Sequence, residues 1–152
     1  MRIVIQRVLS AGVVVNGDLV DKREIGAGLV VLVGFCGEDD DKIIKFMANK
    51  LVNLRIFSDE GGFMDRSLLD DGLEILVVSQ FTLYANCRHG RRPSFTEAAK
   101  PDVAILMYER FLEELCGVVP TVKSGEFGAD MKVELVNDGP VTIVLDSNDF
   151  PI

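Results

Sequence analysis

The sequence predicts an α+β fold in which a curved or barrel-like β-sheet is flanked by two main helices. Short runs rich in apolar and β-branched residues occur along most of the chain, whereas only two segments have the spacing of an amphipathic helix. A doubly wound parallel fold would need more helical crossovers than two. No repeat or linker divides the 152 residues, so we expect a single domain over residues 1–152, with 146–152 as a loosely held tail.

The first third of the chain is predicted to be rich in strands. Residues 2–8 and 12–15 combine apolar and β-branched side chains, and residues 19–25 form the returning strand. Asn16-Gly17 predicts a tight hairpin turn between them, because both residues tolerate positive φ. Residues 29–33 are an unbroken apolar run, which is typical of an interior strand.

The two predicted helices lie in the middle and in the last third of the chain. Apolar residues recur at helical spacing from about residue 40 to residue 54, after acidic residues that suit the positive end of a helix dipole. A short strand at 55–58 and a turn at 59–62 follow. The second helix is expected to begin at Pro101, which fits a first helical turn, and to stop at Gly117.

The stretch from Leu73 to Tyr84 changes character halfway along. Its first half is apolar and β-branched, as in a strand that is buried on both faces. Its second half contains Ser79, Gln80 and Thr82, whose polar groups would be costly to bury without partners. These side chains either bond to neighbouring backbone at a strand end or face a ligand.

Three further strands are expected at 118–122, 131–136 and 142–145, with Asn137-Asp138-Gly139-Pro140 between the last two. Glycine has no Cβ and proline has no amide hydrogen, so the Gly-Pro pair can present backbone carbonyls with little steric cover. Such carbonyls suit an ammonium group, and a rigid proline wall would restrict the configuration of the adjoining carbon. The alternative is a plain four-residue hairpin loop with a trans peptide bond.

Composition restricts the classes of function. The net charge of −8 argues against general nucleic-acid affinity, but residues 88–92 (Arg-His-Gly-Arg-Arg) form a basic loop that either guides a phosphate backbone or is simply solvated. Cys36, Cys87 and Cys116 are odd in number and far apart, so neither a disulfide framework nor a cysteine-rich zinc site is expected. No apolar run reaches the length of a membrane span, and no signal-peptide pattern is present, so we expect no membrane contact and a cytoplasmic location.

Residue content excludes most familiar catalytic arrangements. His89 is the only histidine, and it lies in the basic loop, so a Ser-His-Asp arrangement is not expected. Cys87 lies two residues before it, which leaves a thiol–imidazole pair on one face of an extended segment as an alternative. The chain contains no P-loop, dinucleotide fingerprint or Gly-x-Ser-x-Gly motif. We expect no metal and no cofactor.

Several motifs occur in the same order as in one known family. They are Arg55-Ile56-Phe57-Ser58-Asp59, Val77-Val78-Ser79-Gln80-Phe81-Thr82-Leu83, Arg92-Pro93-Ser94-Phe95, Gly125-Glu126-Phe127-Gly128-Ala129-Asp130-Met131 and Asn137-Asp138-Gly139-Pro140-Val141-Thr142. With these motifs, and with Ile5-Gln6-Arg7-Val8 near the start, the chain resembles the D-aminoacyl-tRNA deacylases. The likeness ends at Leu145, and only the tail lies outside it.

The resemblance implies a homodimer that hydrolyses the ester bond of D-aminoacyl-tRNA. In the family, a Ser-Gln-x-Thr motif of one subunit, here Ser79, Gln80 and Thr82, meets a Gly-cisPro motif of the other, here Gly139 and Pro140. The cis-proline motif captures the α-amino group of the D-aminoacyl ester and excludes L-amino acids sterically. Glycine has no side chain to exclude, so glycyl-tRNA mischarged on the alanine tRNA is a second family substrate.

The resemblance also suggests how the reaction proceeds. We expect backbone amides around Gln80 and Phe81 to be free at the strand end and to stabilise the tetrahedral oxyanion, with Ser79 and Thr82 shaping the site. Water is the expected nucleophile, oriented by the 2′-hydroxyl of the terminal adenosine. Direct attack by Thr82 is the rival mechanism, for which the sequence offers no base.

Further residues are expected to bind the substrate. Phe127, Ala129 and Met131 match the family segment that lines the pocket for the terminal adenosine, although Phe127 and Met131 also suit core packing. Arg7 is expected to brace the Gly-Pro loop. Two other classes remain open, namely a non-catalytic RNA- or DNA-binding dimer that uses the basic loop of residues 88–92, and a general esterase, which would need a base that is not visible.

Overall fold

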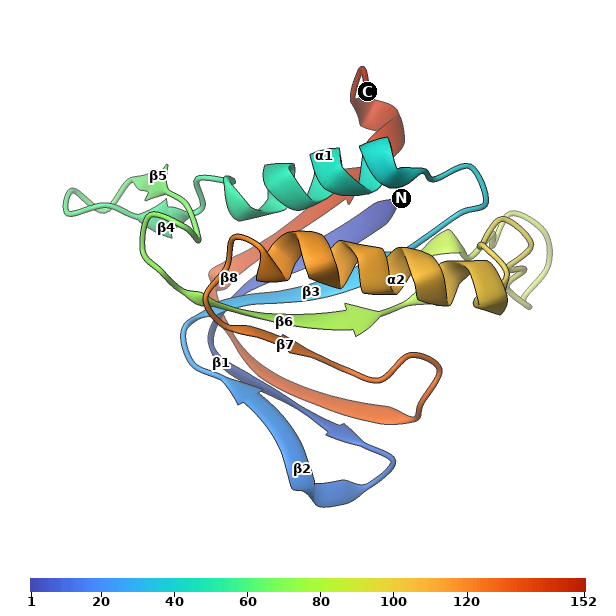
Figure 1. The fold of residues 1–152 in the computed structure, drawn as a ribbon, viewed down its shortest axis with the longest axis horizontal. Coiled ribbons are helices and arrows are strands. Elements are labelled where there is room, and N and C mark those ends of the chain that lie inside the picture. The colour runs from blue at the N-terminus through green and yellow to red at the C-terminus, as the bar shows by residue number, and fades with distance from the viewer.

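The computed structural model describes residues 1–152 and consists of a strongly bent β-sheet with two helices packed on one side (Figure 1). The elements are β1 (Arg2–Val15), β2 (Asp18–Ile25), β3 (Gly28–Gly34), α1 (Asp41–Val52), β4 (Phe57–Ser58), β5 (Met64–Arg66), β6 (Glu74–Ser79), the 3₁₀ helix η1 (Phe81–Tyr84), α2 (Pro101–Cys116), β7 (Val122–Ser124), β8 (Met131–Asp146) and the 3₁₀ helix η2 (Ser147–Asp149). The main sheet has the order β2-β1-β3-β6-β7, and β8 also pairs with β1. The predicted α+β fold, with a barrel-like sheet and two main helices, is confirmed.

Strand β1 is continuous, whereas the sequence predicted two strands at 2–8 and 12–15. Its first half pairs with β3, from Arg2 opposite Gly34 to Val8 opposite Gly28. Its second half pairs with β2, and β8 accompanies it along nearly its whole length. Pairing with partners that are distant in sequence therefore keeps the exposed middle of β1 extended, which local residue patterns do not reveal.

Strands β3 and β6 run through the centre of the sheet, as their apolar runs predicted, and they pair in parallel with each other. Val33 of β3 lies opposite Ser79, so the two strands end at the same level. Their side chains are divided between two clusters: Val31 and Val77 belong to the core beneath the helices, and Val30 and Leu76 to the core inside the bent sheet. Burial on both faces explains why the runs are continuous instead of alternating.

Both helices occur where their periodicity predicted them. Helix α1 begins after Asp40, whose carboxylate accepts a hydrogen bond of 2.9 Å from the Ile43 amide. Helix α2 begins at Pro101, and Tyr108 ties it to the sheet by donating to the Val77 carbonyl at 3.0 Å. Burial raises the pKa of Tyr108 to about 12. Neither helix is long and apolar enough to cross a membrane.

Two short strand predictions were inaccurate. Strand β7 begins only at Val122, because Val119 still donates to the Leu115 carbonyl at the end of α2, at 2.8 Å. The predicted strand at 55–58 is limited to β4, and its partner β5 was missed. Strand β5 is three residues long and all three are exposed, so it has none of the apolar alternation that marks a strand.

Strand β8 is the largest departure from the sequence prediction. Instead of two strands joined by a hairpin loop, one strand continues along β1, and Gly139-Pro140 lies in a bulge within it. Thr142 lies opposite Gln6 and Asn137 lies opposite Val8, so the residues between them protrude from the ladder. The Gly139-Pro140 peptide bond is cis. The Asn137 side chain closes the bulge by accepting a hydrogen bond of 2.8 Å from the Val141 amide.

The tail at 146–152 is fixed by contacts with the rest of the fold, whereas the sequence predicted a loosely held end. Ser147 is buried, and its amide donates to the Met1 carbonyl at 2.9 Å. The Phe150 ring packs against Phe46 of α1 with 5.4 Å between the ring centroids. The tail therefore joins the start of β1 to helix α1.

Asp146 at the end of β8 gives folding a defined acid dependence. Partial burial raises its pKa, but hydrogen bonds from Arg2 and from the Asn148 amide outweigh that effect and hold the pKa of Asp146 below its ordinary value of 3.8. Because the folded-state pKa is the lower one, the stabilisation is present above the unfolded-state pKa of about 4 and is lost as the pH falls through the folded-state value. In denaturant unfolding, Asp146→Asn should therefore lose less stability than wild type between neutral pH and about pH 3. Equal losses would contradict this assignment.

Candidate active site

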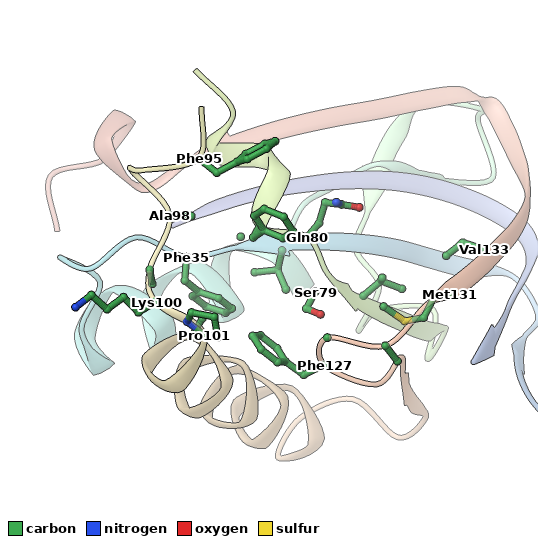
Figure 2. Close-up of a pocket in the computed structure, with 18 of the residues that line it drawn as sticks. Phe35, Ser79, Gln80, Phe95, Ala98, Lys100, Pro101, Phe127, Met131 and Val133 are labelled. Carbon is green, nitrogen blue, oxygen red and sulfur yellow. The ribbon is translucent and has the colours of Figure 1, made fainter. Parts of the chain in front are cut away.

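A cavity of about 730 Å³ opens at the end of β6. Its walls come from the ends of β3 and β6, from η1, from the segment that leads into α2, and from the connection between β7 and β8 (Figure 2). The predicted site residues that line it are Ser79, Gln80, Phe81, Phe127, Ala129 and Met131. Thr82, Arg7, Gly139 and Pro140 do not line it.

The two ends of the cavity differ in chemistry. Phe35, Phe127 and Pro101 form one end, and Met131 with Val133 forms the other, while Ser79 lies between them (Figure 2). Flat aromatic faces suit the stacking of a nucleobase, whereas aliphatic side chains provide only an apolar surface. The first end therefore fits the base of a terminal nucleotide.

Ser79 and Gln80 lie where β6 leaves the sheet. The Ser79 hydroxyl has no hydrogen-bond partner in the protein and lines the cavity. The Gln80 amide is not free, because it donates to the Val33 carbonyl at 2.7 Å and so extends the ladder by one bond. The prediction of a free Gln80 amide is therefore wrong. The Gln80 side chain donates to the Thr82 hydroxyl at 2.5 Å.

Two free backbone donors are present one residue later. Phe81 begins η1, and the first amides of a helix have no acceptor within it. The Phe81 and Thr82 amides donate to no acceptor in the protein. They form adjacent donors at the positive end of a short helix, an arrangement that can stabilise an oxyanion. The Phe81 donor was predicted, whereas the Thr82 donor was missed because nothing in the sequence indicated a 3₁₀ turn.

Phe95 is the main cavity residue that sequence reasoning did not assign. Its ring meets the exposed Phe81 ring edge to face, with 5.0 Å between the ring centroids. Phe95 belongs to the motif Arg92-Pro93-Ser94-Phe95, so the family resemblance included this residue but gave no function for its side chain. Lys100 at the outer edge of the aromatic end was also missed, and it directly precedes Pro101 (Figure 2).

Phe127 and Met131 satisfy both of the alternatives that the sequence left open. Phe127 packs 6.0 Å from the Tyr108 ring between centroids and against the core beneath the helices, yet it also lines the cavity. Met131 packs against the other core and lines the cavity too. A side chain placed on Gly125 would overlap with the Met131 sulfur, so this glycine lets the cavity wall approach β6.

Arg7 contacts the Gly139-Pro140 bulge, as the sequence predicts. It is buried, and its Nε atom donates to the Asp138 carbonyl at 3.2 Å and lies 3.2 Å from the Asp138 carboxylate. Its Nη1 atom donates to the Ile56 carbonyl at 2.5 Å. Gly139 and Pro140 themselves are exposed. Whether this group binds substrate stays a prediction.

Within one chain, the bulge and the cavity are far apart. Arg7, at the level of the bulge, lies opposite Leu29, whereas Ser79 lies opposite Val33. Four residues along the strands correspond to roughly 13 Å, and the three strand spacings from β8 to β6 add roughly 14 Å across the sheet. Measured along the sheet, the two motifs are therefore separated, and neither Gly139 nor Pro140 lines the cavity of its own chain.

The basic loop is electrostatically unlike the rest of the surface. Every arginine outside it forms an ion pair with a carboxylate, namely Arg2, Arg7, Arg23, Arg55, Arg66 and Arg110. Arg88, Arg91 and Arg92 are exposed and form none. The loop precedes the segment that lines the cavity, so its free positive charge lies next to the site. No hydrogen bond joins Cys87 to His89.

Comparison with known proteins agrees with this geometry. The family described as D-Tyr-tRNA(Tyr) deacylase matches residues 4–146. Proteins named D-aminoacyl-tRNA deacylase from Parabacteroides distasonis and Clostridium botulinum are 53% and 52% identical, over 97% of this chain and 97% of each relative. A solved structure of a c-Myc DNA unwinding element binding protein has a TM-score of 0.89 at 42% identity, over 96% of this chain and 98% of that one. A probable eukaryotic D-amino acid tRNA deacylase has a TM-score of 0.83 at 19% identity, over 95% and 97%, which is a likeness of fold.

The fold and the relatives define a class of hydrolases whose names refer to aminoacyl-tRNA. The chain belongs to the D-aminoacyl-tRNA deacylase family. The resemblance that its motifs indicated is therefore confirmed.

Proposed function

We propose that the protein hydrolyses the ester bond of D-aminoacyl-tRNA and releases free tRNA and the D-amino acid. Family membership supports the reaction, and the free Phe81 amide at a cavity with an aromatic wall, next to the free Thr82 amide, supports its location. The substrate then enters with its terminal adenosine against Phe127 and with its ester carbonyl toward Phe81 and Thr82. We also propose that the protein acts as a single domain, in the cytoplasm, where aminoacyl-tRNA is used.

The active site is proposed to form between two copies of the chain. The observation that carries this proposal is the separation of the bulge from the cavity within one chain, which leaves each motif group incomplete. Exposed apolar side chains flank the bulge on β8, since Val136 is 53% and Val144 is 66% exposed. Pairing of two copies over this surface would bury these valines and bring Gly139-Pro140 of one copy to the cavity of the other.

Discrimination between D- and L-amino acids is assigned to Gly139 and Pro140. The exposed carbonyls of this bulge would accept hydrogen bonds from the substrate ammonium group, and the proline ring would exclude an L side chain. Glycine presents no side chain to exclude, so glycyl-tRNA mischarged on the alanine tRNA is a second proposed substrate. Arg7 would fix the bulge through its bonds to Asp138 and Ile56.

Water is the proposed nucleophile, and the Phe81 and Thr82 amides are the proposed oxyanion donors. The Thr82 hydroxyl accepts a hydrogen bond from Gln80, and the hydrogen bonds of the structure link it to no base that would remove its proton. Direct attack by Thr82 would leave an acyl-enzyme. Trapping that species by rapid acid quench in wild type, together with its absence in Thr82→Ala, would reverse this preference.

The basic loop is proposed to contact the phosphate backbone of the tRNA. Arg91→Ala should weaken tRNA binding at low salt and lower the slope of log K against log salt by about 0.7–0.9, without changing the preference for the D-ester. Arg110→Ala is the matched control, because Arg110 is already paired with Glu113 and Glu114 on α2. A binding titration over a range of salt concentrations measures the slope, and an unchanged slope in Arg91→Ala would refute the contact.

One structural relative supports a second candidate function. The relative with 42% identity is described as a DNA unwinding element binding protein, and the unpaired arginines of the basic loop would serve such a role. The net charge of −8 opposes general DNA affinity.

Deacylation of matched D-tyrosyl-, L-tyrosyl- and glycyl-tRNA by the purified protein tests the main proposal. Hydrolysis of the D- and glycyl esters with the L-ester spared is the expected result. Hydrolysis of none of them by a folded protein that binds duplex DNA would favour the second candidate.

A further inference from the structure

Arg2 makes two contacts with the end of η1 and a third with Asp146 at the end of β8. Its Nη1 atom donates to the Leu83 carbonyl at 3.0 Å, and its guanidinium carbon lies 4.5 Å from the centre of the Tyr84 ring. Its Nε atom donates to the Asp146 carboxylate at 2.7 Å. We propose that Arg2 is a positioning residue, which holds η1 so that the Phe81 and Thr82 amides at the other end of this helix point to the oxyanion.

Helix η1 needs such support from outside. It has only four residues, and so short a helix is not stable by itself. The Ala85 amide caps the Thr82 carbonyl, but the Leu83 carbonyl accepts no bond from a backbone amide of the helix, and a donor with positive charge is favourable at this end. Arg2 provides the donor to Leu83, and its guanidinium, which is paired with Asp146, lies at this end of the helix.

Tyr84 strengthens the link between Arg2 and the helix. The residue is 4% exposed, and its hydroxyl has no hydrogen-bond partner, so packing and the guanidinium contact hold the ring in place. Burial raises the pKa of Tyr84, which therefore stays neutral. A neutral ring presents a face to the cation without a competing charge.

Asp146 holds Arg2 in position from the opposite side. The ion pair is only partly exposed, with 33% of the Arg2 side chain and 21% of the Asp146 side chain accessible. The next residue, Ser147, bonds to the Met1 carbonyl, so the chain on both sides of the pair is fixed. The end of β8 and the tail thereby help to position η1 at the site. The family motifs did not indicate this function for them.

The inference rests on the proposed deacylase function, and kinetics are its first test. Arg2→Met keeps an unbranched apolar stem but removes the charge, the donors and the guanidinium group that contacts Tyr84. We expect kcat for D-tyrosyl-tRNA to fall about tenfold with KM changed less than about twofold, because the oxyanion forms only in the transition state. Arg2→Lys should restore part of kcat, since one ammonium cannot serve Leu83 and Asp146 in the same geometry. Arg110→Met on α2 is the control and should equal wild type.

Coupling to Asp146 gives a second test. Asp146→Asn should lower kcat, and the double variant with Arg2→Met should be no slower than Arg2→Met alone, because both changes act through one contact. Losses that multiply would overturn the proposed route. A change confined to KM in Arg2→Met would overturn it as well.

Amide hydrogen exchange of residues 80–86 tests the inference without reference to catalysis. Exchange in this segment should be faster in Arg2→Met than in wild type and unchanged in Arg110→Met. If wild type hydrolyses no D-aminoacyl ester, the proposed function fails, yet faster exchange would still establish the support of η1. Unchanged exchange together with unchanged kcat in an active enzyme would refute the role of Arg2 alone.

Discussion

Replacing Phe81 with proline is expected to lower kcat for D-aminoacyl-tRNA by about 10²–10³-fold, the usual cost of one lost oxyanion donor. Proline removes the backbone amide hydrogen and fits the first position of a helix, so η1 should persist. Phe81→Ala is the matched control, because it also removes the ring but keeps the amide.

The comparison of these two variants isolates the backbone donor. The Phe81 side chain is 57% exposed, so its loss should cost little stability, although its contact with Phe95 is removed. We expect Phe81→Ala to keep kcat within about tenfold of wild type. Single-turnover rates measure the chemical step directly. Equal losses in both variants would mean that the ring matters and the amide does not.

Gly139→Ala is expected to reduce deacylation by more than about 100-fold, because the bulge positions the substrate ammonium group and small displacements there are costly. Gly139 has φ +127°, a conformation that residues with a side chain rarely adopt. A Cβ atom there would lie 2.8 Å from Val141 Cγ2 and 3.2 Å from Arg7 Nη2. The added methyl would therefore displace both the bulge and the arginine that braces it.

A second glycine provides the control for this substitution. Gly37 has open space around its Cβ position and no positive φ, so Gly37→Ala should match wild type in activity and in thermal stability. Backbone strain should cost Gly139→Ala about 1–3 kcal/mol of folding free energy. If folded Gly139→Ala protein deacylates at the wild-type rate, the bulge is not part of the active site.

The sequence predicted the elements that short-range patterns determine. The spacing of apolar residues located α1 and α2, and Asn16-Gly17 located the hairpin, where the φ angles are +50° and +76°. The failures occurred where distant partners decide the structure. Gly139-Pro140 suggested the end of a strand, but β8 continues to pair with β1 on both sides of these two residues, which form a bulge. The tail is ordered by Met1 and by α1, which local patterns could not indicate.

The site was only partly predictable for the same reason. Ser79, Gln80 and Phe81 were identified by their motif, and the polar break after an apolar run gave a physical reason to expect a site there. Phe35 and Lys100 reach the cavity from other segments, so only the folded chain reveals them. The donor pair at Phe81 and Thr82 depends on a 3₁₀ turn without a sequence signature.

Mixing Phe81→Pro with Gly139→Ala tests most directly whether the active site is shared between two copies. In a mixed dimer, one site receives both changes and the other site receives neither. Random reassociation of equal amounts should therefore restore about a quarter of the wild-type sites, and D-tyrosyl-tRNA hydrolysis should recover to that level. If each site were built within one chain, every site would retain a defect, and the mixture would stay as inactive as the separate variants.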